Sequence, residues 1–123
     1  MQKRVLIVDD DDELVELLCF NLKQAGFVTS TAPDGVEAIE KASATLPDLI
    51  LLDLMLPELN GFSVCEILRR NATTASIPII MLTALPGELG RLAGLDSGAN
   101  HYLSKPCSIR QLVSLVDNLL GLV

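Results

Sequence analysis

Short apolar runs alternate with longer segments of helical periodicity along the whole chain, and this alternation limits the folds open to it. In each longer segment, apolar residues recur every three or four positions. Regular alternation of this kind is typical of strand–helix units built around a parallel sheet. The predicted strands are 4–8, 28–31, 48–53, 78–82 and 100–103, and the predicted helices are 11–25, 34–45, 61–71, 87–97 and 108–121.

The composition of the strands predicts where each lies in the sheet. Strands 4–8, 48–53 and 78–82 are almost continuously aliphatic, which indicates burial on both faces, whereas 28–31 and 100–103 are more polar and belong nearer the edges. Right-handed crossovers then give a doubly wound, five-stranded parallel sheet of the flavodoxin-like order 2-1-3-4-5. We therefore predict an α/β fold, a three-layer sandwich.

Several predicted helices have recognisable ends. Asp34 and Ser108 are the expected N-caps of the second and fifth helices, and Gly26 is expected to end the first. An apolar stripe gives the first helix its packing face. Its members are Leu14, Leu17, Leu18, Leu22 and Ala25.

Length, charge and cysteine content exclude several classes of protein. A chain of 123 residues fits one domain, 1–123, and it contains neither an apolar run long enough for a bilayer nor a secretory signal, so we expect a cytoplasmic protein. The net charge of -7 argues against direct nucleic-acid binding by this domain. Cys19, Cys65 and Cys107 are odd in number and widely spaced, which predicts free thiols.

Polar residues follow the predicted strands at their carboxyl ends, where open α/β sheets bind ligands. The first strand runs into four aspartates that begin with Asp9 and Asp10, and the third strand ends in Asp53. Thr83 ends the fourth strand and Lys105 follows the fifth. Because the first and third strands are neighbours in the predicted order, Asp9, Asp10 and Asp53 should converge within a few ångströms.

Three adjacent carboxylates repel one another at neutral pH unless they bind a cation or take up protons. A donor set made only of oxygens, with room for water and a phosphate oxygen, suits Mg²⁺. One carboxylate can then act as a nucleophile toward a phosphoryl group, while Lys105 and the metal neutralise the developing charge. Two alternatives stay open: the aspartate run caps the first helix, with Asp11 and Asp12 at its start, or Lys105 forms a simple structural ion pair.

Several short motifs, in the same order along nearly the whole chain, resemble the receiver domain of two-component response regulators. The matching stretches are 5–10 (VLIVDD), 47–57 (PDLILLDLMLP) with Asn60 and Gly61, 77–84 (IPIIMLTA), and 98–106 from Gly98 and Ala99 to Lys105 and Pro106.

The resemblance implies a signalling switch rather than an enzyme. It implies that Asp53 forms an acyl phosphate in a Mg²⁺-dependent reaction, and that a sensor histidine kinase, a phosphotransfer protein or a small phosphodonor supplies the phosphoryl group. It further implies that Asp9, Asp10, Asp53 and the backbone carbonyl of Met55 bind the metal. Lys105 would contact the phosphoryl group, Thr83 and Tyr102 would move as a switching pair, and the bond from Lys105 to Pro106 would be cis. The partner controlled by the switch would be an effector protein or an attached output domain.

The chain departs from this pattern beside the fifth strand. Some receivers attached to DNA-binding domains have two acidic residues before the tyrosine, in a charged face used for homodimers on phosphorylation. Asn100 and His101 stand there in this chain, which disfavours that route although Arg91 remains as a basic partner. We expect His101 to be a solvated residue of an edge strand, and Cys107 to alter the packing after the Lys-Pro pair.

Three rival interpretations fit the sequence less well. A phosphatase of the haloacid-dehalogenase type would use Asp9 and Asp11, but no threonine follows that pair and no later acidic pair holds the metal. The aspartates of 9–12 occupy the loop that would bind a flavin phosphate, which excludes a flavin carrier. A degenerate receiver, which binds partners without phosphorylation, is disfavoured because all five expected polar residues are present. They are Asp9, Asp10, Asp53, Thr83 and Lys105. The sequence leaves open whether the chain is a stand-alone regulator or a module of a longer protein.

Overall fold

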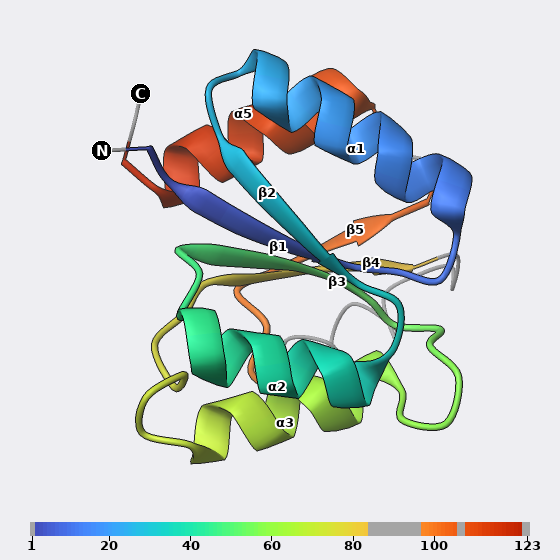
Figure 1. The fold of residues 1–123 in the computed structure, drawn as a ribbon, viewed down its shortest axis with the longest axis vertical. Coiled ribbons are helices and arrows are strands. Elements are labelled where there is room, and N and C mark those ends of the chain that lie inside the picture. The colour runs from blue at the N-terminus through green and yellow to red at the C-terminus, as the bar shows by residue number, and fades with distance from the viewer. Residues whose placement is uncertain (1, 84–96, 106–107, 122–123) are drawn as a thin grey trace.

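The computed structural model describes residues 2–83, 97–105 and 108–121, and the account of the structure is confined to them (Figure 1). Nine elements are described, and Figure 1 shows a central sheet between two layers of helices. They are β1 (Arg4–Val8), α1 (Asp12–Gln24), β2 (Val28–Ala32), α2 (Gly35–Thr45), β3 (Leu49–Asp53), α3 (Gly61–Arg70), β4 (Ile79–Thr83), β5 (His101–Ser104) and α5 (Ile109–Leu119). The predicted helix 87–97 lies outside the described residues except for Ser97, which belongs to a turn.

The sheet is parallel with the strand order β2-β1-β3-β4-β5, which confirms the predicted fold class and order. Helices α1 and α5 cover one face, and α2 and α3 cover the other (Figure 1). Each face therefore has its own apolar core: one cluster contains Leu18, Leu112 and Val116, and the other contains Ala38 and Val64.

The central strands are buried on both faces, as their aliphatic composition predicts. Every residue of β3 and β4 is buried, and in β1 only Arg4 is exposed. The edge strands β2 and β5 contain mostly exposed or half-buried residues. This difference fixes the middle of the sheet by side-chain packing and leaves the edges to be held in other ways.

The helix ends agree with the predicted caps. The side chains of Asp34 and Ser108 accept hydrogen bonds from the backbone N–H groups of Glu37 and Gln111, at 2.9 and 3.3 Å. Gly26 follows α1 with a φ of 97°, a left-handed conformation that glycine adopts without strain.

The predicted apolar stripe of α1 is wrong in two members. Leu18 and Leu22 are buried, but the side chain of Leu17 is 48% exposed and Ala25 is also exposed. The half-buried Val15 and Cys19 belong to the packing face instead. The face therefore runs through positions 14, 15, 18, 19 and 22. Successive helical residues are about 100° apart, so Leu17 turns away from the sheet.

The ends of β4 and β5 lie one residue later than predicted. Pro78 has no N–H group to donate to the ladder, and the strand begins at Ile79. Asn100 also stands outside its strand, although its N–H donates to the carbonyl of Ile79 at 2.8 Å. None of the helices in the described part of the chain is long and apolar enough to cross a membrane.

Candidate phosphoacceptor site

Three carboxylates meet at the carboxyl end of the sheet. Asp9 follows β1 directly, and Asp53 is the last residue of β3, which pairs with β1. One oxygen from each of Asp9, Asp10 and Asp53 lies within 4.8 Å of the others. Asp9 and Asp53 are buried, with 4% of each exposed, whereas Asp10 is exposed. The strand order thus brings these side chains together as expected, and the group is open to solvent on the Asp10 side.

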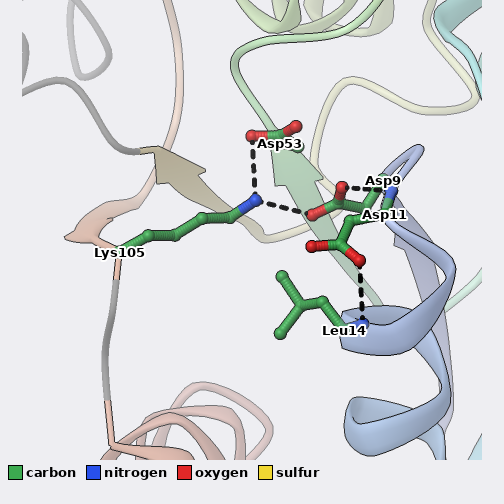
Figure 2. Close-up of polar contacts among 5 residues, drawn as sticks. All are labelled: Asp9, Asp11, Leu14, Asp53 and Lys105. Atoms are coloured by element: carbon green, nitrogen blue, oxygen red, sulfur yellow. Dashed lines mark hydrogen bonds and ion pairs between the residues drawn. The ribbon is translucent and has the colours of Figure 1, made fainter.

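Lys105 reaches the same point from the end of β5. Its Nζ lies 2.8 Å from Asp9 Oδ2 and 3.3 Å from Asp53 Oδ1, so that one ammonium group bridges two carboxylates (Figure 2). Its backbone N–H donates to the carbonyl of Thr83 at 2.6 Å, which extends the pairing of β4 with β5 by one step. The side chain is therefore directed inward over the sheet edge.

The aspartate run has two separate roles. Asp9 Oδ1 accepts the N–H of Asp11 at 3.0 Å, which holds the Asp9 carboxylate at the site. Asp11 is the N-cap of α1, because its Oδ1 accepts the N–H of Leu14 at 3.3 Å (Figure 2), and Asp12 lies in the first turn. The capping interpretation thus holds for Asp11 and Asp12, while Asp9 and Asp10 face Asp53.

The environment of Asp53 makes its negative charge costly. Burial and the neighbouring charge of Asp9 raise the pKa of the Asp53 carboxyl above its ordinary value, although Lys105 and the backbone N–H of Met55 oppose the rise. Asp53 Oδ1 is buried and accepts no hydrogen bond within the described part of the chain; its approach to Lys105 Nζ is a charge contact without hydrogen-bond geometry. A buried carboxylate oxygen of this kind, beside two more carboxylates, suits a cation.

Lys105 is stabilised in its charged form. Burial alone would lower the pKa of its ammonium group, but the hydrogen bond to Asp9 and the charges of Asp53 and Asp9 together raise that pKa. The site therefore holds one fixed positive charge among three carboxylates, and the cluster retains net negative charge with which to bind a metal ion.

Gly61 brings the start of α3 close to Asp53, a role that the motif match alone did not identify. A Cβ at this position would lie 2.6 Å from the Asp53 carbonyl oxygen and 2.8 Å from Leu54 Cα. The N–H of Gly61 donates to the carbonyl of Leu54 at 2.9 Å, and Asn60 caps the helix through the N–H of Ser63. A glycine directly after a capping residue, at the first position of a helix, is the sequence signal that could have indicated such close packing.

The remaining predicted residues surround this cluster. Thr83 is a fully buried residue at the end of β4, one position beyond the partner of Asp53. Tyr102 is half-buried in β5 beside Met81 and packs against the core on the α2 and α3 face. Met55 lies two residues after Asp53 with its side chain 60% exposed. The switching roles of Thr83 and Tyr102 and the metal-binding role of the Met55 carbonyl stay predictions, while Pro106, Cys107 and Arg91 lie outside the described residues.

Comparison with known proteins decides the family. The family model described as "Response regulator receiver domain" matches residues 5–117. The chain belongs to this family. It is thus the receiver domain of a two-component response regulator, as the sequence motifs predicted.

Similar receivers occur in several bacteria. The chain is 45% identical over 117 residues to the DNA-binding dual master transcriptional regulator RpaA of Synechocystis sp., a match that covers 95% of the chain and 48% of RpaA. It is 44% identical to the alkaline phosphatase synthesis transcriptional regulatory protein PhoP of Bacillus subtilis, over 98% of the chain and 49% of PhoP. The chain therefore spans about half the length of these curated relatives.

Solved receiver structures share the whole architecture. A putative response regulator from Chloroflexus aurantiacus superposes with a TM-score of 0.94 at 38% identity, and the match covers 98% of this chain and 99% of the other. The shared fold therefore covers nearly the whole of both chains.

Proposed function

We propose that Asp53 accepts a phosphoryl group in a Mg²⁺-dependent reaction and that the acyl phosphate sets the signalling state of this receiver. One observation carries the proposal: a buried carboxylate, Asp53, has an oxygen without a hydrogen bond in the described structure, 3.3 Å from the Lys105 ammonium and within an acidic cluster. Packing alone gives no reason to place these groups together.

The donors of the cluster fit Mg²⁺ better than a softer metal. Asp9, Asp10 and Asp53 offer only carboxylate oxygens, and no histidine or cysteine belongs to the group in the described residues. These three side chains would hold the ion, together with the carbonyl of Met55. When bound, the ion supplies positive charge that offsets the repulsion among the carboxylates and stabilises a transferring phosphoryl group.

Asp53 is suited to be the nucleophile. An oxygen of its ionised carboxylate forms a bond to phosphorus. The bond between phosphorus and the donor breaks, and the electron pair of that bond stays with the donor. No proton has to leave Asp53, because the carboxylate is already deprotonated when it reacts. Lys105 remains beside the Asp53 oxygen and stabilises the negative charge on the phosphoryl oxygens.

The donor is a sensor histidine kinase, a phosphotransfer protein or a small molecule such as acetyl phosphate. RpaA and PhoP are named as transcriptional regulators, and by analogy this receiver controls an output domain or an effector protein, through Thr83 and Tyr102. The chain acts as a switch and not as a turnover enzyme, because its product is its own modified side chain. Where the target is DNA, the output domain contacts it and the receiver does not, because the receiver has a net charge of -7.

Intact-mass spectrometry after incubation with acetyl phosphate and Mg²⁺ tests the assignment. We expect one phosphoryl adduct on the wild-type chain and none on Asp53→Asn, since an amide cannot serve as the attacking oxygen. Asp48→Asn is the matched control, because Asp48 lies just before the other end of β3 and accepts the N–H of Arg4 at 2.7 Å. A stoichiometric adduct on Asp53→Asn would show that the phosphoacceptor is another residue.

A further inference from the structure

The strand that carries Lys105 has weak packing to fix its register. No residue of β5 is fully buried, and the strand pairs on one side only, with β4. Tyr102 and Leu103 are half-buried against opposite cores, while His101 and Ser104 are exposed. Because a slip of one residue turns every side chain of a strand to the opposite face, such a short edge strand needs another device to hold its register.

Arg69, near the end of α3, contacts the turn that precedes β5. Its guanidinium group donates to four acceptors: the carbonyls of Gly98 at 2.8 Å, Ala75 at 3.1 Å and Ile77 at 2.7 Å, and Asn100 Oδ1 at 2.9 Å. The planar fork of arginine can span several acceptors in fixed directions, which the single ammonium of lysine cannot. One side chain therefore joins the loop before β4 to the turn before β5.

Asn100 completes this connection at the first residue of β4. Its N–H donates to the Ile79 carbonyl, and its Oδ1 accepts the Ile79 N–H, both at 2.8 Å. The same Oδ1 also accepts from Arg69. Both polar backbone groups of Ile79 are thus bound by one residue of the neighbouring segment, which sets the alignment of β5 on β4.

Gly98 allows the arginine to lie against the turn. Its φ of 111° favours glycine, and a Cβ there would lie 2.7 Å from Arg69 Cγ. Arg69 on α3 therefore holds the segment 98–100, which we call the β5 clasp.

We propose that Arg69 is a positioning residue for the phosphorylation site: through the β5 clasp it fixes the register of β5 and so delivers Lys105 to Asp9 and Asp53. The inference rests on the proposed function of Lys105. Arg69 acts from the amino end of β4 and β5, whereas Lys105 lies at their carboxyl ends, so the effect passes along the strand.

A double-mutant cycle tests the positioning role, with the rate of phosphorylation by acetyl phosphate as the readout. Arg69→Ala should slow the wild-type reaction by roughly three- to tenfold, less than the ~100-fold that a 1 Å misplacement can cost. In a Lys105→Ala background the same change should have almost no further effect, because the residue that it positions is gone. Equal fold-losses in both backgrounds would overturn the proposal. A Lys105→Ala rate equal to wild type would overturn both the role of Lys105 and the positioning role.

Arg70→Ala is the matched control. Arg70→Ala removes the same charge from the same helical turn. The Arg70 side chain, however, is 80% exposed and contacts only Glu66, at 4.0 Å. We expect wild-type rates, and a loss equal to that of Arg69→Ala would attribute the effect to charge and contradict the clasp.

Hydrogen exchange gives a readout that does not depend on phosphate chemistry. Amides of 101–104 should exchange faster in Arg69→Ala than in wild type and Arg70→Ala, while those of β3 stay unchanged. Unchanged exchange in β5 would overturn the clasp even if phosphorylation proved real.

Asn100 variants keep the test open if Arg69→Ala does not fold. Asn100→Asp retains an acceptor oxygen for Arg69 and Ile79, so the exchange of the β5 amides and the rate of phosphorylation should match wild type. In Asn100→Ala those amides should exchange faster and phosphorylation should be slower. Identical behaviour of the two variants would contradict the role of this oxygen.

Discussion

The two charged halves of the site are built on different parts of the sheet. Asp9 and Asp53 lie at the ends of β1 and β3, strands whose apolar side chains are 0 or 1% exposed. Lys105 follows β5, an edge strand without a fully buried residue. The negative groups are thus attached to the tightly packed centre of the domain, and the positive group is attached to its rim.

This difference suggests how a small domain combines a fixed site with a movable response. Elements with few buried contacts open at low free energy, and switching elements are drawn from them. On the proposed function, the carboxylates would stay in position while β5, with Tyr102 and Lys105, adjusts to a phosphoryl group on Asp53. Substitutions in the centre and at the rim should therefore differ in their effects on stability and on phosphorylation.

The largest expected effect is the loss of stability when a leucine at the centre of the domain is truncated, compared with a leucine at the rim. Leu51 in β3 is fully buried, and Leu51→Ala should lower the free energy of unfolding by about 3 kcal/mol or more. Leu103→Ala in β5 should cost less than about half as much, because that side chain is already partly exposed. Urea denaturation of both variants provides the measurement. Equal losses would mean that the rim is held as firmly as the centre.

The next prediction concerns the stability cost of the buried charge. Because burial and Asp9 raise the Asp53 pKa above 3.8, ionised Asp53 destabilises the fold at pH values above its folded pKa, and this cost disappears as the pH falls below 3.8. Asp53→Asn should therefore be more stable than wild type at pH 7, by about 4 °C in Tm for each kcal/mol relieved, and the gain should shrink toward pH 4.

Thermal unfolding across that pH range checks the sign. Asp10→Asn is the control, since it removes the same charge from an exposed position of the cluster and should change Tm less. A Tm for Asp53→Asn below that of wild type at pH 7 would indicate that Lys105 outweighs burial at Asp53.

A smaller effect is expected on metal binding at the solvent side of the cluster. Asp10→Ala should weaken Mg²⁺ binding by about tenfold, equivalent to ~1.4 kcal/mol, with slower phosphorylation as a consequence. Asp12→Ala should leave the affinity nearly unchanged, because Asp12 belongs to the first turn of α1. Isothermal titration calorimetry measures both, and an unaltered Mg²⁺ affinity in Asp10→Ala would restrict the outer aspartates to helix capping.

The smallest effect concerns the lifetime of the phosphorylated state. Met55, which is exposed, lies two residues after Asp53, and Leu85 lies two residues after Thr83, so the sequence predicts that both flank the phosphoryl group. Leu85 lies outside the described residues. Neither side chain can orient a water for hydrolysis, so decay should be slow. Met55→Asn should quicken it about threefold, because an amide can hold that water. A time course of intact mass after removal of the phosphodonor gives the rate, and an equal or slower decay would contradict the idea.

Much of the candidate site could be predicted because its residues stand at strand ends. Continuous aliphatic runs indicated the central strands, and adjacency of the first and third strands then placed Asp9, Asp10 and Asp53 together. The outer face of α1 was mistaken at Leu17 because several leucines in one helix fit more than one stripe. The β5 clasp was also missed, because Arg69 contacts carbonyls and one amide oxygen that no local pattern connects with it.

The sequence by itself determined the α/β class, the strand order, the helix caps at Asp34 and Ser108, and the acidic edge, because these follow from local periodicity and chain order. Only the tertiary structure decided which charges are buried and which contacts hold the rim. The pKa shift of Asp53 depends on burial and on the distances to Asp9 and Lys105. These two residues lie 44 and 52 positions away from Asp53 along the chain. The alignment of β5 likewise depends on an arginine 29 positions before Gly98, since hydrogen bonds between distant segments exist only after the chain has folded.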